Sequence, residues 1–211
     1  MKTGSNFATS RITDFITELQ SGAPTPGGGA VAALDSALGV ALIMMVANHT
    51  IGKKKYEACE ELNKCAVAMC ESLLEELIIG IDKDAEAFEA VSAAYSMPRE
   101  TDEEKQARSD AIATASIEAA KAPLKVMIAS VDALKICNNL IGNSNTNLVS
   151  DLYVAALNLQ SGLMSARYNV FANLNAISKK DETLSLKMKT LAEKLTVQGL
   201  ELAGDIVLGE E

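Results

Sequence analysis

The sequence predicts an all-α protein, a single domain over residues 1–211 that forms a bundle of long antiparallel helices. Three observations support this prediction. Apolar residues recur at intervals of three and four along almost every segment, which is the spacing of one helix face. No segment alternates apolar and polar residues as a half-buried strand would. The breaks between periodic segments are short, and short connections place consecutive helices antiparallel.

Six helices are expected in chain order, at residues 11–20, 26–50, 56–95, 101–141, 147–177 and 181–207. The first is short and amphipathic, with apolar residues at Ile12, Phe15, Ile16 and Leu19. The second is rich in alanine and follows prolines and glycines. The third is long and ends near Pro98.

The fourth expected helix begins with Asp102, Glu103 and Glu104, in a first turn where negative charge is favoured. Pro123 should kink or break this helix, because proline has no N–H to donate to the preceding turn. The fifth helix follows a turn-like stretch of glycine, asparagine, serine and threonine at 142–147. The sixth completes the bundle.

Composition and charge exclude several classes of protein. There are 19 basic and 28 acidic residues, a net charge of −9, whereas general nucleic-acid binding needs a basic surface. Residues 30–47 contain no Lys or Arg and reach the lower limit of a membrane span. They include Asp35 and are dominated by alanine, so we expect a buried helix and no membrane. Residues 1–20 lack the apolar core of a signal peptide, which favours a cytoplasmic protein.

No metal site is expected. The four cysteines, at Cys59, Cys65, Cys70 and Cys137, include no CxxC pair, and His49 is the only histidine. Free, buried thiols in a reducing compartment are the better interpretation.

The stretch from Pro24 to Ala33 reads PTPGGGAVAA and is unusual for a helix start. We expect Pro26 at the first helical position, with Thr25 before it as N-cap. Three helical glycines would cost roughly 2–3 kcal/mol relative to alanine. Either a tight bend between two helices or a ligand cradle at a helix N-terminus explains that cost. The dinucleotide fingerprint does not apply, because a helix and not a strand precedes the glycines.

A carboxylate interrupts an apolar stripe of the third helix. Asp84 is in step with Ile81 and Phe88, whereas Asp82 is rotated about 200° away on the wetter face. A buried carboxylate needs a partner or takes up a proton. Asp84 is therefore either a structural cap or ion-pair partner, or a functional acid.

Two further patterns leave alternatives open. Small and polar residues of the fifth helix follow one face from Asp151 to Asn169, which fits either a pocket wall or a helix–helix contact. The run from Lys53 to Lys55 is either a solvated turn or a site for ligand carboxylates.

The order of these motifs resembles the formiminotetrahydrofolate cyclodeaminase family, which includes methenyltetrahydrofolate cyclohydrolases. The resemblance covers nearly the whole chain. It is carried by PTPGGGAVAA at 24–33, MVAN at 45–48, IGKKKY at 51–56, DAEAF at 84–88, Gly142-Asn143, Ser150-Asp151 and Asn169-Val170.

The resemblance implies an enzyme of one-carbon folate chemistry. The favoured reaction converts formimino-tetrahydrofolate to methenyl-tetrahydrofolate and ammonia. The alternative is methenyl-tetrahydrofolate cyclohydrolase on the same scaffold. A helical scaffold that binds a partner without chemistry is the non-enzyme alternative, and the glycines and Asp84 argue against it.

The resemblance also implies roles for particular residues. Asp84 would be the catalytic acid and base, with a pKa lifted by its apolar surroundings. The substrate would contact Pro26, Gly27, Gly28, Gly29, Lys53, Phe88, Asn143, Ser150, Asp151 and Asn169. The ligand would be a tetrahydrofolate derivative as substrate, possibly polyglutamylated, with no metal or nucleotide cofactor. A homodimer is expected. Two residues depart from the family pattern. Asp35 stands where the family favours a small neutral residue, and Ala30 stands where relatives often have serine.

Overall fold

The computed structural model describes residues 6–209, and these residues form helices and turns without a strand. The prediction of an all-α bundle is confirmed. The elements are η1 (Phe7–Thr9), α1 (Ile12–Leu19), α2 (Gly28–Asn48), η2 (Lys54–Cys59), α3 (Glu60–Tyr95), α4 (Asp102–Leu140), η3 (Thr146–Leu148), α5 (Val149–Ser178) and α6 (Glu182–Leu208). The third and fifth expected helices begin later than predicted, because short 3-10 helices precede α3 and α5.

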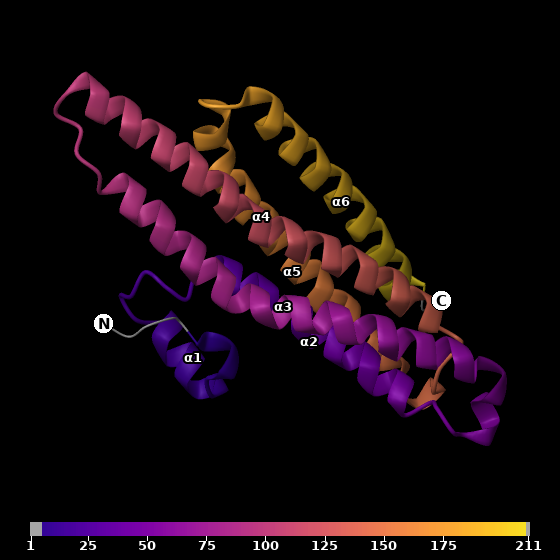
Figure 1. Cartoon of the computed structure of the whole chain (residues 1–211). Coiled ribbons are helices and arrows are strands. Elements are labelled where there is room, and N and C mark those ends of the chain that lie inside the picture. The colour runs from indigo at the N-terminus through magenta and orange to yellow at the C-terminus, as the bar shows by residue number, and fades with distance from the viewer. Residues whose placement is uncertain (1–5, 210–211) are drawn as a thin grey trace.

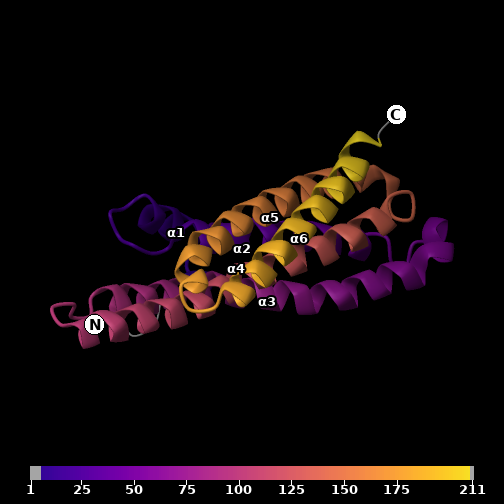
Figure 2. The same cartoon turned by 90° about the horizontal axis from the view of Figure 1, so that it is seen from above.

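Helix α2 occupies the centre of the bundle. It packs against α3, α4 and α5, and Figure 2 shows it between α3 and α5. Its small residues allow close approach: a Cβ added at Gly162 of α5 would lie only 2.8 Å from the carbonyl oxygen of Ala32. Among the described residues α2 is the one helix long and apolar enough to span a membrane, and more than half of it is buried in the bundle. We therefore interpret it as a core helix.

Helices α3 and α4 form the longest hairpin of the bundle and lie side by side (Figure 1). Helices α5 and α6 complete the core, to which all six α-helices contribute buried side chains. Helix α1 lies apart from the long helices, and its Phe15 packs edge-on against Phe7 with ring centroids 6.2 Å apart.

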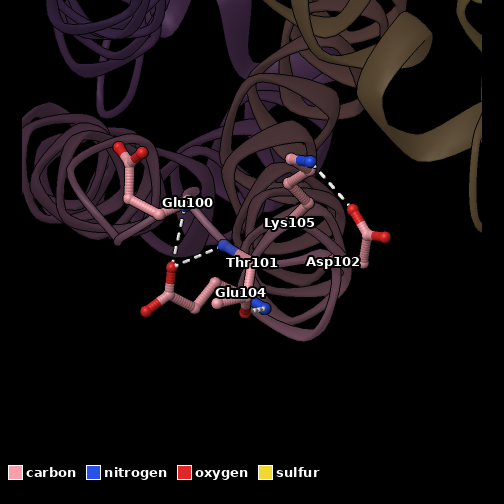
Figure 3. A network of polar contacts seen from close by, with 5 residues as sticks. All are labelled: Glu100, Thr101, Asp102, Glu104 and Lys105. Carbon is pink, nitrogen blue, oxygen red and sulfur yellow. Dashed lines mark hydrogen bonds and ion pairs between the residues drawn. The ribbon is translucent and has the colours of Figure 1, made fainter.

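Local sequence rules account for the start of α4. Thr101 is the N-cap: its hydroxyl accepts from the Glu104 N–H at 3.2 Å, and the Glu104 carboxylate accepts from the Thr101 N–H at 3.1 Å. Figure 3 shows this capping box, together with the ion pair between Lys105 and Asp102 at 2.8 Å. The acidic first turn is confirmed.

Three expectations, two about the helices and one about the cysteines, differ from the structure. Helix α2 begins at Gly28 with Gly27 as its N-cap, so Pro26 and Thr25 precede the helix. The reason is that the cap comes from another helix, as described below. The expected break at Pro123 does not occur, since α4 continues through this buried residue. Cys65 is exposed and Cys59 half-buried; only Cys70 and Cys137 are buried thiols, and burial raises the pKa of each to about 12.

Candidate active site

The start of α2, the middle of α3 and the second half of α5 surround a cavity of about 380 Å³. This volume lies within the range of small-molecule sites. The cavity is lined by Pro24, Thr25, Gly27, Gly28, Asp84, Ala87, Phe88, Val91, Ala119, Asn169, Ala172 and Asn173. It therefore brings together five of the residues predicted for the site: Gly27, Gly28, Asp84, Phe88 and Asn169.

Asp84 caps helix α2 from helix α3. Its Oδ2 accepts a hydrogen bond from the Ala30 N–H at 3.1 Å, one of the N–H groups that a helix start leaves unpaired. A negative charge at this position also interacts favourably with the helix dipole. The structural alternative considered for Asp84 is thus realised, and the same carboxyl group lines the cavity.

The glycines allow this contact. A Cβ added at Gly29 would collide with the carboxylate of Asp84, so a side chain at this position excludes the observed arrangement. At Gly28 an added Cβ would lie 3.6 Å from Nδ2 of Asn169, and at Gly27 it would meet nothing within 4 Å. The glycines are therefore more than a tight bend between two helices. Because Gly29 has no side chain, the Asp84 carboxylate of α3 can reach the N-terminal end of α2.

Burial raises the pKa of Asp84 above its ordinary value, and the hydrogen bond from the Ala30 N–H partly opposes this shift. No Lys or Arg forms a salt bridge with Asp84 among residues 6–209. A carboxyl group with a raised pKa accepts a proton more readily than an ordinary carboxylate and can also return it.

Helix α5 supplies the amide wall of the cavity. Nδ2 of Asn169 donates to the carbonyl of Ser165 at 2.9 Å, and Nδ2 of Asn173 donates to the carbonyl of Asn169 at 3.0 Å. Each of these bonds holds an amide side chain against the preceding turn of α5. The polar stripe of α5 serves two purposes, because Asn169 borders the cavity while Gly162 packs against α2.

Four predicted site residues lie far from this cavity. Lys53, Asn143, Ser150 and Asp151 follow the C-terminal end of α2 or lie near the start of α5. Helix α2 has 21 residues, so its two ends are about 30 Å apart. Within one chain the predicted residues thus form two groups.

The distant group has hydrogen bonds of its own. Asn63 donates to the carbonyl of Asn143 at 2.9 Å, and the Tyr56 hydroxyl lies 3.1 Å from the hydroxyl of Thr146. Hydrogen bonding to Thr146 and Lys55 lowers the pKa of Tyr56 to about 8. His49 is exposed at the same end of α2, remote from Asp84.

Other predicted positions have different surroundings. Pro26 is buried and Gly29 lies against Asp84, although neither lines the cavity. Asp82 does not lie on a solvent-exposed face of α3, in contrast to the prediction. It is half-buried and accepts from the N–H groups of Phe7 at 2.6 Å and Ala8 at 3.4 Å, which fastens η1 to α3.

Asp35 accepts from the Ser161 hydroxyl at 2.8 Å, so helix α5 of the same chain provides its partner. Sequence reasoning missed Asn173. The signal was present, because Asn173 continues the polar stripe one turn beyond Asn169. No group of three or more His, Cys, Asp or Glu that could hold a metal ion occurs within residues 6–209.

Comparisons with known proteins identify relatives of this chain. The family model described as formiminotransferase-cyclodeaminase matches residues 11–194. A protein of Methylorubrum extorquens named methenyltetrahydrofolate cyclohydrolase is 40% identical over 169 residues, which cover 80% of this chain and 81% of that protein. Rat formimidoyltransferase-cyclodeaminase is 30% identical over 191 residues, but the chain spans only 35% of its length. The crystal structure of formiminotetrahydrofolate cyclodeaminase from Thermotoga maritima superposes with a TM-score of 0.84 at 30% identity, covering 95% of this chain and 97% of the other.

Proposed function

Because the chain belongs to the formiminotransferase-cyclodeaminase family, we propose that it is a methenyltetrahydrofolate cyclohydrolase acting in the cytoplasm. The supporting observation is the relative of that name, which matches this chain at 40% identity over four-fifths of both proteins. Sequence analysis favoured the cyclodeaminase reaction, whereas this relative favours the alternative. The scaffold hypothesis is excluded, since the family is one of enzymes.

Asp84 is the proposed acid and base. In the hydrolysis, water attacks the methenyl carbon that bridges N5 and N10, and the Asp84 carboxylate takes a proton from this water. The bond from the carbon to N5 then breaks, and the Asp84 carboxylic acid returns the proton to N5. The product is 10-formyl-tetrahydrofolate, and one proton is released to solvent. The raised pKa of Asp84 suits both transfers.

Formimino-tetrahydrofolate cyclodeaminase is the second candidate. The Thermotoga structure, with a TM-score of 0.84, and the rat relative carry that activity in their names. In this reaction N10 attacks the formimino carbon, loses a proton, and ammonia departs. The same carboxyl group would take the proton from N10 and protonate the leaving nitrogen.

We further propose a homodimer that binds the glutamate tail of the folate. One chain keeps Lys53 and Asp84 at opposite ends of α2, and a second copy placed antiparallel would bring such ends together. Leu38 of α2 and Leu157 of α5 are half exposed, at 49% and 50%, which offers apolar surface for this contact. Light scattering that finds only the 22.3 kDa mass of one chain at micromolar concentration would contradict the dimer.

Folinic acid, a stable 5-formyl analogue, tests the substrate class. An enzyme of this chemistry should be stabilised against heat by a saturating concentration, because the ligand binds only the folded state. An unchanged melting temperature, together with no heat of binding by calorimetry, would refute the folate assignment.

A further inference from the structure

We propose that Asn173 orients the pterin ring of the substrate by accepting a hydrogen bond from its 2-amino group. This inference rests on the proposed function and names a positioning residue within the same cavity. Asn173 lies outside the motifs that carry the family resemblance.

The side chain of Asn173 presents an acceptor to the cavity. The residue is half-buried and lines the cavity wall, and its Nδ2 donates to the Asn169 carbonyl at 3.0 Å. This bond fixes the amide and engages one of its two N–H groups, and Oδ1 is the acceptor that it offers to a ligand. No N–H or O–H of residues 6–209 donates to that oxygen.

The packing of α2 shows where this oxygen lies relative to the acid. Gly29 and Ala33 of α2 meet Asp84 and Gly80 of α3, so the two helices are antiparallel. The order of contacts is likewise reversed on α5, where Asn169 lies beside Gly28 and Leu159 lies beside Gly39. Helices α3 and α5 therefore run in the same direction along the cavity.

One helical turn beyond Asp84, the cavity is lined by an aromatic residue of α3 and an amide of α5. Asn173 follows Asn169 by four residues, and Phe88 follows Asp84 by four residues, so each lies about 6 Å farther along its helix. Phe88 lines the cavity and is 44% exposed. An aromatic face and a hydrogen-bond acceptor thus occupy the same side of the reacting group.

A reduced pterin matches this arrangement in one orientation. The reaction takes place at N5 and N10, and the pyrimidine ring with its 2-amino group lies on the side of the bicycle away from N10. If the bridge carbon is at Asp84, the pyrimidine ring extends toward Phe88 and its amino group toward Oδ1 of Asn173. The reverse orientation would place the aminobenzoyl ring there, and its carbon edge has no N–H for this acceptor, which would lose its hydrogen bond to water without replacement.

Two substitutions of similar size separate this role from a structural one. Asn173→Asp keeps an acceptor but cannot donate to the Asn169 carbonyl, whereas Asn173→Leu loses both functions. We expect calorimetry with folinic acid to give a Kd about tenfold weaker for Asn173→Leu and within about threefold of wild type for Asn173→Asp. Asn175→Leu, at an exposed position of α5 outside the cavity, should bind as wild type does.

A second ligand identifies the group that donates. With a folinic acid analogue that lacks the 2-amino group, Asn173→Leu should bind as tightly as wild type. Equal weakening by Asp and Leu would show a structural role, and wild-type affinity for Asn173→Leu would show no role; either result overturns the inference. Failure of the wild-type protein to bind folinic acid would instead overturn the proposed function itself, and this inference with it.

Discussion

Asp84→Asn separates the two roles that the structure gives to Asp84. The amide keeps the size of the carboxyl group, and its Oδ1 can still accept from the Ala30 N–H, now 3.1 Å from the carboxylate. The cap of α2 should therefore survive. The amide cannot carry a proton between substrate atoms, so general acid and base catalysis should be lost, which is worth about 10²–10⁴-fold in turnover.

Asp84→Ala provides the comparison. It removes the acceptor and leaves the Ala30 N–H unpaired in a partly buried position, at a cost of about 1–3 kcal/mol in the free energy of unfolding. Urea unfolding should therefore rank the variants, with Asp84→Asn close to wild type and Asp84→Ala less stable. Turnover, followed by the loss of methenyl absorbance, should be low in both.

The pH dependence of stability gives a further check on the same variant. Since burial raises the pKa of Asp84 in the folded state, folding favours the protonated form. The stability that this provides is fully present below the ordinary value of 3.8 and is lost as the pH rises through the raised pKa. The free energy of unfolding of wild type should thus fall relative to that of Asp84→Asn as the pH rises from about 3.8 through the raised pKa.

Asp82→Asn is the matched control on α3. Asp82 holds η1 through the N–H groups of Phe7 and Ala8, and an amide oxygen can also accept from them. Its turnover should remain near that of wild type. Full activity in Asp84→Asn, or equal losses in the two variants, would remove Asp84 from the mechanism.

Three other predictions follow from the geometry. Gly29→Ala should lower kcat at least tenfold, because the new Cβ displaces the Asp84 carboxylate. Gly22→Ala, at an exposed position outside the cavity where an added Cβ meets nothing within 4 Å, should leave kcat nearly unchanged. Gly28→Val should weaken folinic acid binding more than it lowers the melting temperature, and the opposite outcome would restore the tight-bend interpretation. Thr101→Ala should cost about 1 kcal/mol in urea unfolding through the lost capping box and leave kcat unchanged, whereas reduced turnover at full stability would contradict a purely structural role.

The helices could be predicted from the sequence because their determinants are local. Apolar spacing, together with the alanine content of α2, predicted the six helices, and the acidic residues after Thr101 marked the start of α4. The start of α2 could not be predicted in this way. Its cap is Asp84, which is 54 residues away from Ala30, and local rules therefore favoured Thr25 and Pro26.

The candidate site, too, could be predicted where it depends on local spacing and could not where it depends on contacts between distant segments. Helical spacing singled out Asp84, and the structure places it beside Gly29 in a cavity. Spacing along one helix carries no information about which helix ends lie close together, so the separation of Lys53 from Asp84 was not foreseen. For Asp82, rotation about the helix axis indicated solvent, whereas the chain returns at Phe7 to cover it.

We propose that this chain catalyses chemistry at the one-carbon bridge of tetrahydrofolate with Asp84 as its acid and base. Incubating the purified wild-type and Asp84→Asn proteins with methenyl-tetrahydrofolate and, separately, with formimino-tetrahydrofolate tests it most directly. Wild type should convert the methenyl compound to 10-formyl-tetrahydrofolate faster than the spontaneous reaction, and Asp84→Asn should be slower than wild type by about 10²–10⁴-fold. Turnover of the formimino compound alone would replace the cyclohydrolase with the cyclodeaminase, and turnover of neither compound would contradict the account.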